Sequence, residues 1–151
     1  MREIEFRGQR CSNGKWVYGY YIESKISWRG HKPHKSWIAS GAISNGGFFN
    51  ILGRYAIKDD TVSQFTGLHD KHGKKVFEGD IVEVDDFTSA YTSKYRGVVK
   101  MYRGYWCVEY EDSILEMTAH PMLFFDDFAD RKTEVIGNIF DNPELMKGKT
   151  A

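Results

Sequence analysis

The sequence predicts a mainly β protein of antiparallel strands, with one or two short helices. Its apolar residues are mostly aromatic or β-branched, which are the types that favour strands. Its 15 glycines interrupt the apolar runs at short intervals, as turns do in all-β proteins. In the C-terminal half, Gly-Asp-Ile-Val at 79–82, a polar loop at 85–93, Gly-Val-Val at 97–99 and Trp-x-Val at 106–108 follow one another. This order is typical of SH3-like barrels, so we expect such a barrel there.

The first two strands are expected to form a hairpin. Residues 3–7 alternate between polar and apolar side chains, and Asn13-Gly14 is a strong hairpin-turn signal before the apolar run at 15–22. Side chains of a strand point to opposite faces with a period of two. One face of the second strand is therefore expected to carry Trp16, Tyr18, Tyr20 and Ile22.

The next stretch of the chain is rich in glycine. Residues 36–39 and 48–55 have strand composition, and Gly41, Gly46 and Gly47 between them indicate a loop. We expect two further strands here.

The second half contains the strands of the expected barrel. Strand composition occurs at 76–84, 97–101, 105–111 and 134–140, and Arg103-Gly104 marks a hairpin turn. Val82 and Val84 are expected to point into the barrel. Across the hairpin, the strand that holds Val99 and Met101 is expected to meet the strand that holds Trp106, Val108 and Tyr110.

One or two short helices are expected near the C-terminus. Asn142 is an N-cap candidate, Pro143 suits the first helical position, and Gly148 would end the helix after about one and a half turns. A second short helix is expected at 122–128, behind Pro121.

Length, composition and cysteine content restrict the class of protein. The 151 residues (17.5 kDa) suit one domain, and 41% hydrophobic with 28% charged residues excludes a disordered chain. No apolar run is long enough to span a membrane, and the N-terminus is not a signal peptide. Cys11 and Cys107 are too few and too far apart for a secreted disulfide framework, so we expect a cytoplasmic protein with no membrane partner.

The net charge of zero hides a strong polarity. Residues 1–58 hold 10 Lys or Arg and 3 Asp or Glu, whereas residues 59–151 hold 11 and 18. The chain thus joins a basic, hairpin-rich segment of net charge +7 to an acidic segment of −7 that contains the expected barrel. Such a polarity favours a charged partner, packing of the two segments against each other, or self-association between copies.

Three blocks of the chain resemble the YopX family of phage and prophage proteins: residues 4–20, 61–82 and 134–145. The resemblance implies a protein of the bacterial host cytoplasm. The family's biochemical role is unassigned, and it offers no catalytic residues to carry over. We take the following residues of the second and third blocks as structural motif positions: Gly67, Asp70, Gly73, Glu78, Gly79, Asp80, Gly137, Asn138 and Pro143.

The chain departs from the family pattern at two places. Residues 68–73 read Leu-His-Asp-Lys-His-Gly where members usually read Leu-Lys-Asp-Lys-Asn-Gly, and residues 24–57 have no counterpart in the family. The first departure places two histidines in the central block, and the second makes residues 24–57 particular to this chain.

Four histidines raise the question of a zinc site. They form two His-x-x-His pairs: His31 with His34, and His69 with His72. Both pairs lie in polar turns, and resembling proteins carry Lys and Asn in place of the second pair. We therefore expect no metal and no cofactor, and we expect His72 to take a left-handed turn conformation, which histidine tolerates.

The carboxylates suggest a metal-dependent hydrolase as a remote alternative. Asp80, next to Glu78 and Gly79 at a strand start, is its best candidate residue. No nucleophile, base and orienting partner can be assembled around it, so we expect no enzyme. The expected role of Asp80 is to fix its turn by accepting hydrogen bonds from backbone N–H groups.

The residue pattern leaves two binding functions open. One segment mixes basic and aromatic side chains suited to phosphates and base stacking: Trp28, Arg29, Lys32, Lys35 and Trp37. The two tryptophans could equally fasten a hairpin to the core. We expect a non-enzymatic accessory protein that binds a host or phage protein or itself, because the acidic half would repel nucleic acid. Nucleic-acid binding through the basic segment is the alternative.

Overall fold

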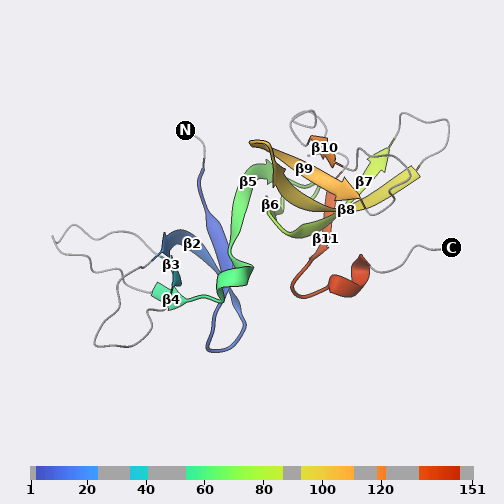
Figure 1. Ribbon diagram of the computed structural model, residues 1–151. Coiled ribbons are helices and arrows are strands. Elements are labelled where there is room, and N and C mark those ends of the chain that lie inside the picture. The colour runs from blue at the N-terminus through green and yellow to red at the C-terminus, as the bar shows by residue number, and fades with distance from the viewer. Residues whose placement is uncertain are drawn as a thin grey trace, which may run out of the picture. The chain divides into compact units, whose positions relative to one another are not determined.

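The computed structural model describes residues 3–23, 35–40, 54–86, 93–110, 119–121 and 133–146 (Figure 1). In these residues the chain forms two sheets of antiparallel strands and two single-turn 3₁₀ helices. The mainly β prediction is therefore confirmed. The chain divides into two compact units, Met1–Phe65 and Thr66–Ala151. Within the described ranges, no helix has the length and apolar character needed to cross a membrane.

The N-terminal unit holds a sheet in the order β4-β3-β2-β1, with the start of β5 beside β1. The strands are β1 (Phe6–Gln9), β2 (Trp16–Glu23), β3 (Ser36–Ala39), β4 (Arg54–Ala56) and β5 (Ser63–His69), and the 3₁₀ helix η1 (Asp59–Thr61) precedes β5.

The predicted turn between β1 and β2 is confirmed. Gly14 has a φ of +68°, and the Asn13 side-chain oxygen accepts a hydrogen bond from the Lys15 N–H at 3.0 Å. In β2, a Cβ on Gly19 would lie 2.1 Å from the Ala39 carbonyl oxygen, so β2 and β3 approach closely at this glycine.

The C-terminal unit holds a five-stranded sheet in the order β10-β9-β8-β7-β11, and β6 lies beside β5. The strands are β6 (Lys75–Phe77), β7 (Asp80–Asp86), β8 (Ser93–Tyr102), β9 (Tyr105–Tyr110), β10 (Ala119–Pro121) and β11 (Thr133–Asn138), followed by the 3₁₀ helix η3 (Pro143–Leu145).

One face of the five-stranded sheet supplies the core of this unit. Val82 and Val84 of β7 are buried as predicted, and Val99 of β8 lies opposite Val108 of β9. The whole cluster consists of Val76, Val82, Val84, Val99, Trp106, Val108 and Val135. Aromatic and β-branched side chains thus fill the core, as the residue types indicated.

A two-residue turn joins β8 to β9, as predicted. Its central residues, Arg103 and Gly104, have φ values of +48° and +91°. Two positive φ values are the mark of a type I′ turn, whose twist matches that of a hairpin.

The expected SH3-like barrel is not confirmed, because the described strands form two sheets rather than a closed barrel. The two edges of β7 are taken by β8 and β11, whereas β5 and β6 continue the other sheet. Closure therefore does not follow from the order of the strand motifs along the chain.

The expected C-terminal helix is reduced to the single turn of η3. Pro143 does stand at its start, but the Asn142 side chain makes no capping hydrogen bond. Instead, the Asn138 side-chain oxygen accepts hydrogen bonds from the N–H groups of Phe140 and Asp141, which holds the preceding turn. Gly148, residues 122–128 and the predicted strand at 48–53 lie outside the described residues.

Candidate binding surfaces

The N-terminal sheet presents a row of aromatic and apolar side chains along β2 and β3. Residues opposite each other in an antiparallel pair share a face, and Ile22 lies opposite Trp37. We call the set on this side the aromatic face: Trp16, Tyr18, Tyr20, Ile22 and Trp37. Tyr18 is 46% exposed and Tyr20 64% exposed, so the predicted alternation is present and this side of β2 faces solvent.

The opposite side of β2 is the packed one. The Tyr21 ring lies 5.6 Å from that of Phe6, and its hydroxyl lies 3.2 Å from the Ser36 hydroxyl. Ile38, opposite Tyr21 on β3, is fully buried. Along β2 the side that holds Tyr21 is therefore packed. On the aromatic side, Arg7 and Ala39, which lie opposite Tyr18 and Tyr20, are buried as well.

Two arginines stack on the tryptophans of the aromatic face. The guanidinium carbon of Arg7 lies 4.7 Å from the centre of the Trp16 ring, and that of Arg54 lies 5.2 Å from the Trp37 ring. Both distances suit cation–π contacts. Arg7 is buried whereas Arg54 is exposed, so Arg54 brings a solvent-facing positive charge to this side of the sheet.

The structure places two of the five predicted binding residues. Lys35 is exposed immediately before β3, and Trp37 is half-buried on the aromatic face. Trp28, Arg29 and Lys32 lie outside the described residues, as do His31 and His34. The pattern of the segment at 28–37 did not indicate Arg54, which strand pairing brings to Trp37.

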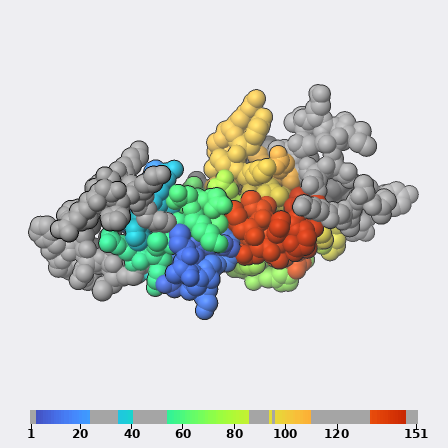
Figure 2. Space-filling model, turned by 60° about the horizontal axis from the view of Figure 1, so that its bottom comes forward, coloured from blue at the N-terminus to red at the C-terminus, as the bar shows by residue number. Residues whose placement is uncertain are grey.

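A second exposed aromatic group stands at the end of the β8–β9 hairpin. Met101 is 43% exposed and Tyr102 47% exposed. The Tyr102 and Tyr105 rings meet edge to face at 6.4 Å, and the Arg103 guanidinium lies 5.3 Å from the Tyr102 ring. We call these four residues the hairpin tip. In Figure 2 the end of this hairpin projects from the other described strands of its own unit.

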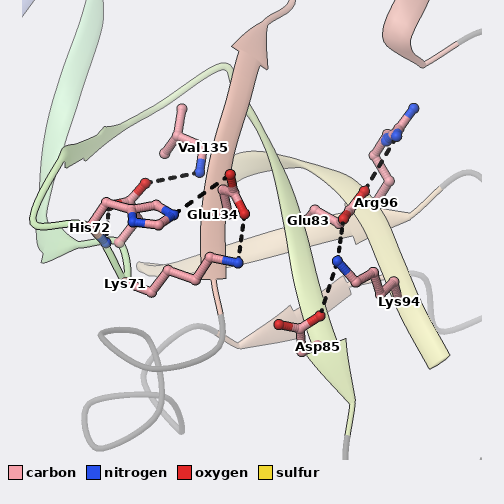
Figure 3. A network of polar contacts seen from close by, with 9 residues as sticks. Lys71, His72, Glu83, Asp85, Lys94, Arg96, Glu134 and Val135 are labelled. Atoms are coloured by element: carbon pink, nitrogen blue, oxygen red, sulfur yellow. Dashed lines mark hydrogen bonds and ion pairs between the residues drawn. The ribbon is translucent and has the colours of Figure 1, made fainter. Parts of the chain in front are cut away.

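A network of charged side chains covers part of the C-terminal sheet (Figure 3). Glu134 of β11 lies opposite Glu83 of β7, and Glu83 lies opposite Arg96 of β8. We call the network the charge ladder; its ion pairs are Lys71–Glu134 at 2.5 Å, Lys94–Glu83 at 2.9 Å, Arg96–Glu83 at 3.3 Å and Lys94–Asp85 at 3.5 Å.

These pairs shift the titration of their members in the direction that keeps them charged. The hydrogen bond from Lys94, supported by Arg96, lowers the pKa of Glu83 against the opposing effect of burial. The hydrogen bond from Lys71 lowers the pKa of Glu134, and the same bond raises the pKa of Lys71. The ladder is thus a set of mutually paired charges.

Asp70 holds the turn between β5 and β6 to β11. Its carboxylate accepts hydrogen bonds from the N–H groups of Val135 at 3.1 Å, Lys74 at 2.9 Å and His72 at 2.9 Å. Burial acts to raise the pKa of Asp70, but these three donors outweigh it and the pKa is lowered. Asp70 is only 3% exposed, so its charge is directed at these backbone N–H groups and stabilises the turn.

The expectation for His72 is wrong. Among the described residues other than glycine, only Arg103 has a positive φ, so His72 does not. At the β5–β6 turn, Gly73 takes that conformation with a φ of +78°. The glycine adopts it at lower steric cost, which leaves His72 in an ordinary conformation. The His72 ring nitrogen lies 3.7 Å from a Glu134 oxygen.

Asp80 also stabilises a turn. Its carboxylate is 1% exposed and accepts a hydrogen bond from the Phe77 N–H at 2.8 Å. Gly79, within the turn, has a φ of +77°. The half-buried Glu78 shares this turn.

The remaining motif positions also belong to turns and irregular strands. Gly67 of β5 has a φ of +88°. Gly137 follows a register shift in β11, and a Cβ there would lie 2.7 Å from the Asn142 side-chain oxygen. Glycine is therefore needed at these two positions for the conformation and close packing of the backbone.

Neither a metal site nor a reactive thiol is found in the described part of the chain. No three His, Cys, Asp or Glu side chains of those residues are grouped so that they could hold a metal ion. Cys107 is buried in β9, and burial raises the pKa of its thiol. A raised pKa disfavours the nucleophilic thiolate.

The family model described as YopX protein matches residues 5–147. Among solved structures, the chain is similar to protein EF1440 from Enterococcus faecalis, with 20% sequence identity and a TM-score of 0.48. That match covers 97% of this chain and 99% of the other. No curated protein matches the chain.

Proposed function

The chain belongs to the YopX family, and from this premise we propose that it is a non-enzymatic phage or prophage accessory protein that binds a protein partner or a second copy of itself. We place its action in the cytoplasm of a bacterial host. The hairpin tip carries the proposal, because it presents the residue types that protein interfaces favour at the end of a paired hairpin.

Tyrosine, methionine and arginine are enriched at protein interfaces. The hairpin tip gathers all three types, and Met101 and Tyr102 are each more than two-fifths exposed. The type I′ turn at Arg103 and Gly104 fixes the backbone between the two tyrosines. A group that is already ordered loses less conformational entropy when it binds.

The roles of Asp80, the candidate residue of the hydrolase alternative, and of two further buried groups support a non-enzymatic function. Asp70 and Asp80 direct carboxylate oxygens at backbone N–H groups of their own turns. The Cys107 thiol is buried and its pKa is raised. Each group thus has a structural explanation.

The charge polarity supports association between copies. Counted by structural unit, residues 1–65 hold 10 Lys or Arg against 5 Asp or Glu, and residues 66–151 hold 11 against 16. The units therefore carry +5 and −5. The basic unit of one copy would attract the acidic unit of another, an attraction that salt weakens.

The test combines light scattering on a size-exclusion column with capture of binding proteins from bacterial lysate. We expect either a mass above 17.5 kDa or a captured protein, and we expect Tyr102→Ala to abolish the association. Tyr18→Ala is the matched control, since Tyr18 is 46% exposed and Tyr102 47% exposed. A monomer at every concentration, with no captured protein that depends on Tyr102, contradicts the proposal.

A further inference from the structure

We propose that the aromatic face of the N-terminal sheet binds single-stranded nucleic acid, with bases stacked on Tyr18 and Tyr20 and phosphates near Arg54 and Lys35. This surface differs from the hairpin tip in its unit and its residues. The two proposals can therefore fail separately.

The tyrosine rings supply the stacking surface. Tyr18 and Tyr20 lie on the same side of β2 and are 46% and 64% exposed. Base-to-aromatic stacking tolerates any base, since every base has a flat π-face. Two tyrosines in adjacent same-face positions therefore provide two sites for neighbouring bases.

The spacing of the tyrosines selects a single strand. Residues two apart in a strand are separated by about 6.6 Å, whereas stacked bases in a duplex are about 3.4 Å apart. Bases that stack on both rings must first separate from each other. A duplex, whose base faces are covered by their neighbours, cannot offer them.

Positive charge lies beside the rings. Arg54 is exposed, and its guanidinium stacks on Trp37 of the aromatic face. Lys35 is exposed directly before β3, and the N-terminal unit as a whole carries +5 by the counts above. This charge complements the phosphate backbone and would not favour a neutral partner.

The backbone under the rings is held in place. Gly19 stands between Tyr18 and Tyr20, and its missing side chain allows the Ala39 carbonyl of β3 to approach. Ala39, which lies opposite Tyr20, contributes only a methyl group on that side of the ring. Close strand pairing thus fixes the spacing of the rings before any ligand arrives.

The test measures fluorescence anisotropy of labelled oligothymidylate and oligouridylate with the full chain at low salt. A duplex of the same length and polyglutamate serve as competitors. We expect the single strands to bind, their affinity to fall steeply as salt rises, and neither competitor to displace them at equal concentration.

Variants locate the site. Tyr18→Ala and Tyr20→Ala should each weaken single-strand binding by roughly 5- to 150-fold, the range that loss of one stacked base produces. Tyr20→Phe, which keeps the ring, should bind within about twofold of the wild type. Tyr102→Ala, an exposed tyrosine of the other unit, should bind unchanged. Thermal unfolding of each variant checks that the sheet is intact.

Several results would overturn the inference. Absence of single-strand binding at low salt does so, as does equal weakening by Tyr102→Ala and Tyr20→Ala. Displacement by polyglutamate would identify a site for acidic polypeptides instead. Displacement by the duplex would show that phosphate attraction alone explains the binding.

Discussion

The two units each turn part of an antiparallel sheet toward solvent, and they place opposite kinds of side chains there. The N-terminal sheet exposes tyrosines, with an arginine on a nearby tryptophan. The C-terminal sheet exposes the charge ladder, in which Glu83 is paired with both Lys94 and Arg96.

This difference separates a stabilising surface from a binding surface. A ligand at the charge ladder must displace ion pairs that already exist, such as Lys71–Glu134. A ligand on the aromatic face covers ring area that water now contacts, which is favourable. We therefore expect changes in the ladder to alter stability slightly, and changes in the aromatic face to alter binding.

The largest effect on stability is expected at a buried carboxylate of the C-terminal unit. Asp70→Ala removes the acceptor of three backbone N–H groups and should lower the free energy of unfolding by about 3 kcal/mol. Urea denaturation measures this loss. A loss of unfolding free energy smaller than that caused by Glu83→Gln in the charge ladder would contradict the structural role assigned to Asp70.

The same residue predicts an acid dependence. Because the folded pKa of Asp70 lies below its ordinary value of 3.8, its charge stabilises the fold above that pH, and the contribution is lost as the pH falls through the lowered pKa. Asp70→Asn should flatten the loss of stability in this acidic range. Denaturation of both proteins across that range tests the sign, and an unchanged slope would refute it.

In the N-terminal unit, the substitution with the largest expected effect on stability is at Gly19, in the backbone that carries the aromatic face. Gly19→Ala would place a Cβ 2.1 Å from the Ala39 carbonyl oxygen, so β2 and β3 must separate. We expect a loss of about 2 kcal/mol together with weaker oligonucleotide binding. Gly14→Ala is the control, since a Cβ at Gly14 meets nothing within 4 Å, although its φ of +68° adds some strain. Equal binding by both variants would show that this strand pairing does not position the rings.

A smaller effect is expected in the charge ladder. Glu83→Gln leaves its neighbours in place and should reduce stability by less than about 1 kcal/mol, since partly exposed ion pairs contribute little. The loss of stability should shrink at high salt, and the variant should bind oligonucleotide as the wild type does. A large change in binding would remove the distinction between the two surfaces.

The smallest effect is expected at the hairpin tip, and it is a gain. Arg103 has a φ of +48°, a conformation that asparagine adopts more readily than arginine. Arg103→Asn should raise stability by about 0.5 kcal/mol and weaken protein binding, because the guanidinium over the Tyr102 ring is lost. A thermal melt and a capture assay measure the two quantities. Loss of stability would show that the arginine supports the turn.

Local features of this fold could be predicted from sequence, and distant pairings could not. Asn13-Gly14 and Arg103-Gly104 each form the predicted turn because their signals lie within the turn itself. Whether the strands close into a barrel was not predictable from motif order, since β11 pairs with β7 from about fifty residues away. Only the pairing shows that the sheet stays open.

For the aromatic face, too, the local pattern was predictable from sequence and the contributions of distant strands were not. The alternation in β2 predicts that Tyr18 and Tyr20 share a face. Tyr21 on the other face is equally aromatic, so the pattern cannot say which side is outward. The exposure of Tyr18 and Tyr20, compared with the half-buried Tyr21, decides it. Arg54 reaches the surface through the pairing of β3 with β4, which no local motif indicates.

The central claim is that the two units offer two different binding surfaces, and a crossed comparison tests it most directly. Tyr20→Ala and Tyr102→Ala are each assayed for single-strand oligonucleotide affinity and for protein association. We predict that Tyr20→Ala loses only nucleic-acid binding and that Tyr102→Ala loses only protein association. If either variant loses both activities to the same extent, or if each loses the activity assigned to the other, the account is contradicted.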